Sequence, residues 1–322
     1  MLPPREELTI CFAHAAYQMQ ACFSALATGI RHFELRSREE LDRRIGEADV
    51  LVVSGLWHNG LIETGKKLRF IQSISAGTDQ YDKPALAAAG IRLASAQGAN
   101  ARAVAEHAMA LILALARRLP EARDNQAARV WRGMISDLTQ REDELGGKTL
   151  LIVGLGRIGG RLAQLARAFD MRVVGFRRDP AAGAGAADEV HTLAELPRFL
   201  PAADVVALTC PLTDETRGVI GARALALLPP GAALVNVARG PCVVEADLLA
   251  ALQAGKLAAA ALDCTDPEPP AAESPLWRLP NVLITPHTAG ETRQYEANVV
   301  ALLMENLDRL WRGETVLRNG VV

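Results

Sequence analysis

Residues 149–160 read TLLIVGLGRIGG, an apolar run that ends in the pattern Gly-x-Gly-x-x-Gly and leads into apolar residues at helical spacing. A strand, a glycine turn and a helix in this order predict a nucleotide site, because the N-terminus of the helix offers free N–H groups and a positive dipole end to phosphates. Gly154 permits the tight turn, Gly156 lets the backbone approach a pyrophosphate, and Gly159 allows close packing of helix on strand. The residues expected at the cofactor are Gly154, Gly156, Arg157, Ile158 and Gly159.

The composition is that of an ordinary two-domain globular chain. It has 322 residues, of which 50% are apolar, 22% charged and only 4% aromatic, so its cores must be built from Ala, Leu, Val and Ile. The formal net charge is −2 and no long basic run is present, which argues against nucleic-acid or membrane partners. No apolar stretch approaches the ~18 residues of a transmembrane helix.

The cysteines and the N-terminus predict a cytoplasmic location. The first residues, MLPPREE, lack the basic and apolar segments of a secretory signal. Five cysteines are scattered and odd in number, which fits reduced thiols and neither a disulfide framework nor a zinc site. We therefore expect no bound metal, and we interpret Cys264, which has no evident base partner, as a packing residue.

Strands alternate with helices in both halves of the chain, which predicts an α/β fold with two doubly wound parallel sheets. A boundary falls near residues 96–99, and the last helix, 291–310, is expected to cross back to the first domain. We thus predict one domain from residues 1–98 and 291–322, and a second from 99–290. The strands expected are 8–13, 31–35, 49–54, 69–75, 91–94, 149–153, 172–176, 204–209, 232–237, 258–262 and 281–284.

Between the two domains lies a segment with two parts. Residues 100–119 form a strongly apolar helix, which must be buried between domains or subunits. Residues 120–147 are polar, rich in arginine and poorly periodic, and we interpret them as an arm that reaches over a neighbour. Trp131 in this arm could approach a partner's site, although surface packing is the simpler interpretation.

The end of the strand 172–176 bears on the choice of cofactor. An acidic residue that bonds an adenosine ribose is expected about 20 residues after the glycines. Arg177 and Arg178 stand there instead, and a pair of guanidinium groups could hold the 2′-phosphate of NADPH. Asp179 is the rival, because a shift of two residues would make it the ribose acceptor. The pattern favours NADP(H) and leaves NAD(H) possible.

Three ionisable residues, Arg239, Glu268 and His287, follow consecutive predicted strands, at the edge where open α/β sheets bind ligands. Histidine suits proton transfer near neutral pH, a carboxylate can orient it, and an arginine can hold a substrate carboxylate. Each residue taken alone is explained as an ordinary loop residue, but the position that the three share favours a catalytic group. The small residues of 73–79, taken alone, predict a plain strand-to-helix turn.

The chain resembles the D-isomer-specific 2-hydroxyacid dehydrogenase family over essentially its whole length. The resemblance is carried by several motifs in the family's order and spacing. They are Gly154–Gly160, Asn236-Val-Ala-Arg239-Gly240, Asp263-x4-Glu268-Pro269, Thr285-Pro-His287-x2-Gly290, Asn100-Ala101 with Val104-Ala-Glu-His107, and Ser75-Ala-Gly77-x-Asp79.

The resemblance implies a role for each of these positions. His287 is the acid/base, Glu268 is its partner, and Arg239 anchors the substrate. Asp263 contacts the nicotinamide carboxamide, and His107 belongs to a motif used structurally. Further positions implied in binding are Cys210 and Pro211 at the cofactor and the backbone of Ala76 and Gly77 at the substrate carboxylate, which reverses the plain-turn interpretation. The family also implies a Rossmann nucleotide-binding domain, a flavodoxin-like substrate domain, and a homodimer built through the nucleotide-binding domains.

Departures from the family pattern refine the expectation. The arginines at 177 and 178 are similar to those of NADPH-preferring glyoxylate and hydroxypyruvate reductases. Glu268 stands where formate dehydrogenases place glutamine, and Thr265 replaces an often aromatic residue. We therefore expect NADPH-dependent reduction of a small 2-ketoacid to the D-2-hydroxyacid. The alternatives are an NAD-dependent D-2-hydroxyacid or phosphoglycerate-type dehydrogenase, and a non-catalytic, nucleotide-sensing protein like the corepressors of this fold.

Overall fold

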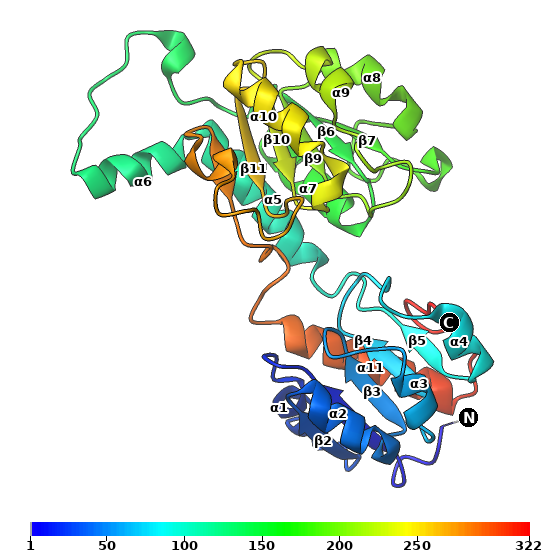
Figure 1. Cartoon of the computed structure of the whole chain (residues 1–322). Coiled ribbons are helices and arrows are strands. Elements are labelled where there is room, and N and C mark those ends of the chain that lie inside the picture. The colour runs from blue at the N-terminus through cyan, green and yellow to red at the C-terminus, as the bar shows by residue number, and fades with distance from the viewer. Residues whose placement is uncertain (1) are drawn as a thin grey trace. The chain divides into compact units, whose positions relative to one another are not determined.

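The computed structural model describes residues 2–322, which form two compact units (Figure 1). Unit 1 comprises Met1–Asn100 and Thr292–Val322, and unit 2 comprises Ala101–Glu291. Each unit is a parallel sheet with helices on both faces, so the prediction of two parallel-sheet α/β domains is confirmed. Within residues 2–322 no helix has both the length and the apolar character needed to span a membrane.

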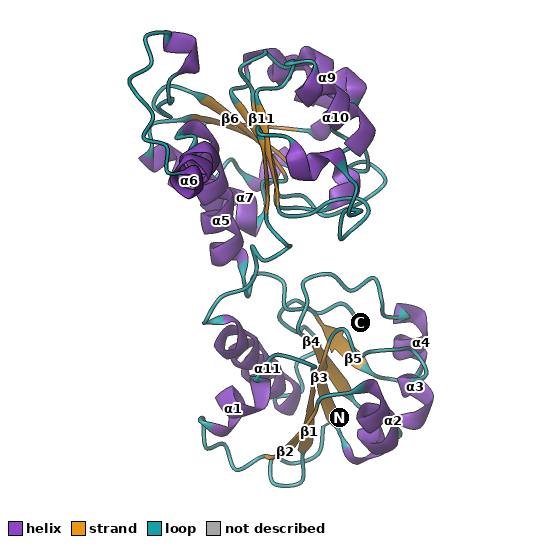
Figure 2. Ribbon diagram, turned by 60° about the vertical axis from the view of Figure 1, so that its left-hand side comes forward, coloured by secondary structure: helices purple, strands orange, loops and turns teal. Residues whose placement is uncertain are grey.

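Unit 1 is built on a five-stranded sheet of order β2-β1-β3-β4-β5 with every pair parallel. Its apolar strands lie between α1 and α11 on one face and α2, α3 and α4 on the other (Figure 2). The strands are β1 Thr9–Ala13, β2 Arg31–Leu35, β3 Val50–Val53, β4 Phe70–Ser73 and β5 Arg92–Ala94. The helices are α1 Met19–Ser24, α2 Arg38–Arg44, α3 Leu61–Thr64, α4 Lys83–Ala88 and α11 Tyr295–Trp311.

The C-terminal helix α11 is joined to unit 1 by a buried polar contact. Asn306 is fully buried, and its amide donates to Gln72 Oε1 at 3.0 Å and accepts from the N–H of Arg318 at 2.8 Å. The chain end then pairs with β5, where Val321 N donates to Leu93 O at 2.7 Å. Since buried amides without partners are costly, these bonds fix the helix and the tail on this sheet.

Unit 2 is built on a seven-stranded parallel sheet of order β12-β11-β10-β9-β6-β7-β8. Helices α5 and α7 cover one face, and α9 and α10 cover the other (Figure 2). The strands are β6 Thr149–Val153, β7 Arg172–Phe176, β8 Glu189–His191, β9 Val205–Leu208, β10 Ala233–Asn236, β11 Ala259–Leu262 and β12 Val282–Ile284. The helices are α5 Ala101–Ala116, α6 Leu119–Ala128, α7 Arg157–Ala168, α8 Leu196–Phe199, α9 Ala222–Leu227 and α10 Glu245–Gln253.

Three features of unit 2 differ from expectation. The edge strand β8 was not predicted, because it has three residues and none of them is fully buried. Helix α6 lies within the segment expected to be an irregular arm, and none of its residues is buried (Figure 1). In the single chain, α5 is buried along one face, which includes Val104, Ala108 and Ile112, and is not buried all round.

The turn between β6 and α7 depends on close packing at Gly159. A Cβ at this position would lie 2.4 Å from Gly154 O, 2.8 Å from Thr209 Oγ1 and 2.9 Å from Ile152 Cγ2. Backbone and buried strand atoms cannot yield to such a contact, so the first turn of the helix can pack on β6 only without a side chain. This is the packing role predicted for this glycine.

Gly159→Ala is therefore expected to lower the free energy of unfolding by about 1–3 kcal/mol, the usual cost of overpacking a core. The neighbouring Gly160 provides a matched control, because a Cβ there has no heavy atom within 4 Å. Gly160→Ala should leave stability unchanged or raise it by up to about 1 kcal/mol through helix propensity. Denaturant unfolding of both variants measures the difference. Equal stabilities would contradict the packing argument.

Candidate active site

The predicted catalytic residues follow three strands that are neighbours in the sheet. Arg239 comes after β10, Glu268 after β11 and His287 after β12, and β12-β11-β10 is the observed order. Parallel strands end at the same edge, so these residues share one edge with the glycine turn that follows β6. Open α/β sheets bind ligands at this edge.

His287 and Glu268 are in direct contact. His287 Nδ1 lies 2.6 Å from Glu268 Oε1, and each side chain is 42% exposed. A carboxylate accepts only, so we assign the proton to Nδ1. The other ring nitrogen, Nε2, has no hydrogen-bond partner among residues 2–322 and can meet a ligand. The pair therefore has the geometry of an oriented proton donor and acceptor.

The backbone at His287 is strained. Its φ is +53°, in the left-handed region, where a residue with a Cβ costs about 1–2 kcal/mol. Such conformations persist where the surrounding structure fixes them, and they cluster at functional sites. Here His287 N donates to Thr285 O at 2.9 Å, which closes a tight turn around Pro286.

Asp263 holds both flanks of this turn. Its carboxylate is 2% exposed and accepts from Thr285 Oγ1 at 2.6 Å, Thr288 N at 3.0 Å and Ala289 N at 3.1 Å. These bonds satisfy the buried charge and bracket His287 on either side. A carboxylate offers about four acceptor positions, so one is left for the nicotinamide amide that the family resemblance implies.

The Arg239 turn is fixed by a buried asparagine. Asn236 Nδ2 donates to Arg239 O at 3.0 Å, and Asn236 Oδ1 accepts from Ala238 N at 3.0 Å. The exposed guanidinium itself donates from Nη1 to Ala238 O at 2.7 Å. At the next residue, Gly240, a Cβ would lie 1.8 Å from Thr265 O, so the turn can rest on the loop after β11 only with glycine there. Sequence reasoning quoted Asn236 in a motif but gave it no role.

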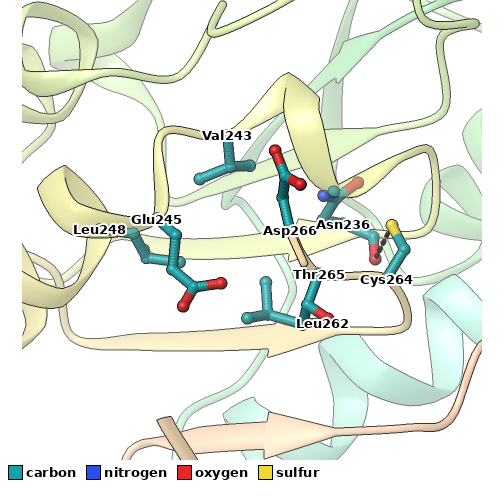
Figure 3. A pocket seen from close by; sticks show the side chains of 9 residues that line it. Asn236, Val243, Glu245, Leu248, Leu262, Cys264, Thr265 and Asp266 are labelled. Atoms are coloured by element: carbon teal, nitrogen blue, oxygen red, sulfur yellow. Dashed lines mark hydrogen bonds between the residues drawn. The ribbon is translucent and has the colours of Figure 1, made fainter. Parts of the chain in front are cut away.

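Behind the Arg239 turn lies a small cavity between the ends of β10 and β11 and helix α10 (Figure 3). Its volume is about 10 Å³, room for about one water and not for a substrate. Cys264 lines it and donates to Asn236 O at 3.8 Å. Burial raises the pKa of the Cys264 thiol well above its usual range, so the group stays protonated, as expected of a packing residue.

The predicted cofactor residues fit an anionic nucleotide. Helix α7 begins after Gly156 with no side-chain cap and with no acidic residue in its first turn, so its N–H groups face no competing carboxylate. Arg157 is exposed there, and Ile158 packs on the core. Cys210 lies against the glycine turn, since a Cβ on Gly154 would meet Cys210 N at 2.5 Å. Pro211 follows at the surface.

The side chains after β7 differ in their contacts. Arg177 Nη1 donates to Gly183 O at 3.1 Å, and Arg178 is exposed. Asp179 Oδ1 accepts from Ala181 N at 3.0 Å and caps the short turn that follows. One oxygen of the rival ribose acceptor is thus engaged in its own turn.

In unit 1, the Ala76–Gly77 loop follows β4. Ser54 Oγ and Ser75 Oγ lie 2.5 Å apart, and Ser75 N donates to Ser73 Oγ at 3.2 Å. Within residues 2–322 the N–H groups of Ala76 and Gly77 have no acceptor, which leaves them available to an anion.

Two further residues, His107 and Thr285, belong to the hydrogen-bond network around Asp263. His107 on α5 has Nε2 at 3.0 Å from Thr285 Oγ1, and Thr285 in turn contacts Asp263. Both residues lie within the motifs that carry the family resemblance. Apart from this membership, no signal in the sequence indicated that they contact the site. No cluster of His, Cys, Asp and Glu that could bind a metal occurs in the part of the chain that the structure describes.

The chain matches one family profile and is similar to several known proteins. A profile of the D-isomer specific 2-hydroxyacid dehydrogenase NAD-binding domain matches residues 109–289. The chain is 36% identical over 301 residues to glyoxylate/hydroxypyruvate reductase B of Yersinia enterocolitica, covering 90% of this chain and 91% of that protein. A crystal structure of a D-isomer specific 2-hydroxyacid dehydrogenase family protein from Aeromonas salmonicida superposes with a TM-score of 0.84 at 30% identity, covering 98% of this chain and 99% of that one.

The chain is also 36% identical over 289 residues to D-3-phosphoglycerate dehydrogenase of Archaeoglobus fulgidus, covering 88% of this chain but 53% of that protein. The chain therefore spans about half the length of the phosphoglycerate dehydrogenases to which it is similar. Because the family profile matches residues 109–289 and the match to the Yersinia reductase covers 91% of that protein, the chain belongs to the D-isomer specific 2-hydroxyacid dehydrogenase family.

Proposed function

We propose that this chain catalyses NADPH-dependent reduction of a small 2-ketoacid, of the glyoxylate or hydroxypyruvate type, to the D-2-hydroxyacid. The observation that carries the proposal is the 2.6 Å contact between His287 Nδ1 and Glu268 Oε1 at the ligand-binding edge of the sheet. The Yersinia reductase, matched along nearly its whole length, supports the substrate class.

In the proposed reaction, bound NADPH supplies the hydride that reduces the keto carbon. Protonated His287 donates a proton from Nε2 to the keto oxygen, while Glu268 holds the ring through Nδ1. Arg239 turns its guanidinium to the substrate carboxylate and keto oxygen and stabilises the developing negative charge. The N–H groups of Ala76 and Gly77 are proposed to bind the carboxylate as well.

The cofactor is proposed to bind at the same edge of the sheet. The uncapped start of α7, with Gly154, Gly156 and Gly159, is proposed to hold the pyrophosphate, and Asp263 the nicotinamide amide. The cofactor contacts proposed beside these are Arg157, Ile158, Cys210, Pro211, Arg177 and Arg178. A cytoplasmic location belongs to the same proposal, because all five thiols are free.

An NAD-dependent phosphoglycerate-type dehydrogenase is the second candidate. The 36% identity to the Archaeoglobus phosphoglycerate dehydrogenase favours it. The exposed Arg178 and the engaged Asp179 carboxylate argue for NADPH instead.

Steady-state kinetics with each cofactor test the function. We expect kcat/KM with NADPH to exceed that with NADH, and to be higher for glyoxylate or hydroxypyruvate than for pyruvate or phenylpyruvate. In the oxidative direction, with NADP+ or NAD+ as hydride acceptor, we expect little turnover of 3-phosphoglycerate. His287→Gln should lower kcat by about 100- to 10,000-fold, the usual contribution of a general acid, with NADPH affinity nearly unchanged.

Three outcomes would change the assignment. Preference for 3-phosphoglycerate with NAD would establish the second candidate. Binding of NADPH without turnover of any substrate would favour a nucleotide-sensing protein. Loss of NADPH binding in His287→Gln would show that His287 is not primarily an acid.

Cofactor preference is tested by Arg177→Asp combined with Arg178→Ala. Guanidinium–phosphate bonds are charge-assisted, so kcat/KM with NADPH should fall about 10- to 100-fold while that with NADH changes little. Arg223→Ala, at an exposed arginine of the same unit, is the control. An unchanged NADPH/NADH ratio in the double variant would favour Asp179 as the ribose ligand.

A homodimer is also part of the proposal. The arm after α6 exposes large apolar side chains, with Trp131 97% and Met134 100% exposed. Monomeric proteins rarely expose such a group of apolar residues, and a second copy that covers the arm would bury them.

Sedimentation of Trp131→Ser combined with Met134→Ser tests this assembly. We expect the wild type to be dimeric at micromolar concentration and the double variant to dissociate about 100-fold more readily, since buried aromatic anchors dominate interfaces. Val316→Ser, at an exposed valine of unit 1, should remain dimeric. A monomeric wild type, or equal dissociation constants, would remove the arm from the interface.

A further inference from the structure

His107 is a half-buried histidine on α5 whose ring is directed at the His287 turn. Its side chain is 24% exposed, and Nε2 lies 3.0 Å from Thr285 Oγ1 and 3.6 Å from Asp263 Oδ1. Helix α5 packs on β10 and β11, and Val104 and Ala108 beside His107 are buried. The position of the ring is therefore set by a helix fixed on the sheet.

The direction of the hydrogen bonds can be assigned. Thr285 Oγ1 donates its single proton to Asp263 Oδ1 at 2.6 Å. The hydroxyl can then only accept from His107, so Nε2 carries a proton and donates it. His107, Thr285 and Asp263 thus form a directed chain from the helix to a buried carboxylate.

This chain ends on the two flanks of His287. Asp263 accepts from Thr285, two residues before His287, and from the N–H groups of Thr288 and Ala289 after it. His287 lies between them with φ +53°. If the Thr285 hydroxyl rotated away, Asp263 would lose its bond on the flank before His287, and with it the restraint that keeps the carboxylate in place for the N–H groups of Thr288 and Ala289.

We propose that His107 is a positioning residue for His287. By donating to Thr285, it holds the hydroxyl in the rotamer that donates to Asp263, and so keeps the strained turn in the geometry that presents His287 Nε2. The inference rests on the proposed function in that His287 is taken as the proton donor. Its alternative is a histidine that only fills space on α5.

The test compares substitutions at both ends of the Nε2–Oγ1 bond in the full chain. His107→Phe keeps a ring but removes the donor, and His107→Gln restores an N–H donor of similar reach. Thr285→Val removes the hydroxyl at constant shape, and Thr285→Ser retains it. Glu106→Gln, which breaks an exposed ion pair with Arg102 on the same helix, is the matched control.

Two readouts are measured. Amide hydrogen exchange at Thr288 and Ala289, without substrate, reports on the turn independently of activity. Kinetics with hydroxypyruvate and NADPH, together with NADPH affinity from fluorescence, separate kcat from binding.

We expect His107→Phe and Thr285→Val to speed exchange at these two amides about 10-fold by local opening of the turn. Their kcat should fall about 10- to 100-fold, as for a small misplacement of a catalytic group, with KM and NADPH affinity little changed. His107→Gln, Thr285→Ser and Glu106→Gln should stay close to wild type.

Unchanged exchange in His107→Phe and Thr285→Val would overturn the proposal. So would faster exchange with unchanged kcat, or a fall in NADPH affinity parallel to kcat. If His107→Phe does not fold, Thr285→Val decides by the same readouts. If the wild type reduces no ketoacid, the proposed function fails, and exchange alone still decides whether His107 holds the turn.

Discussion

The buried carboxylate of Asp263 is the constraint on which the candidate site depends. A charge removed from water is tolerated only when donors surround it, and Asp263 finds one hydroxyl and two N–H groups in the segment after β12. The register of the sheet brings them together, since Leu262 pairs with Ile284 and the next residues, Asp263 and Thr285, then lie side by side. The donors can reach the carboxylate only if the chain turns sharply at His287, so the cost of the left-handed backbone there is offset by satisfaction of a buried charge.

The same principle extends to the neighbouring strands. Asn236 at the end of β10 bonds to both sides of the Ala238–Arg239 turn, and Gly240 rests on Thr265 after β11. Each strand end is thus tied to its own turn or to the next strand by short-range polar or steric contacts. The groups proposed for chemistry are held by a rigid sheet edge, which suits a reaction that needs a proton donor placed to within a fraction of an ångström.

The sequence was informative where a pattern has one physical solution. The run 149–160 predicted β6, its glycine turn and α7, because strand, Gly-x-Gly-x-x-Gly and helix leave few alternatives, and the β-branched runs located the buried strands. It was less informative where structure depends on tertiary contacts. Helix α6 has no apolar face to reveal it, and β8 is held at an edge by only three residues. The motifs contained Asn236, His107 and Thr285, but their bonds depend on side-chain directions and on the pairing of β11 with β12, which no local pattern encodes.

The two carboxylates that follow β11 show how environment divides their roles. Asp263 is buried and accepts three hydrogen bonds, so a change in its charge would leave donors without an acceptor and release the turn. Glu268, five residues later, is 42% exposed and forms an ion pair with the equally exposed His287. A group that must follow the changing charge of an imidazole benefits from contact with water and from having few competing partners, whereas a group that fixes geometry benefits from the reverse. Burial therefore suits Asp263 to the proposed role of holding the turn and Glu268 to the proposed role of supporting the proton transfer, although both carboxylates belong to one short segment.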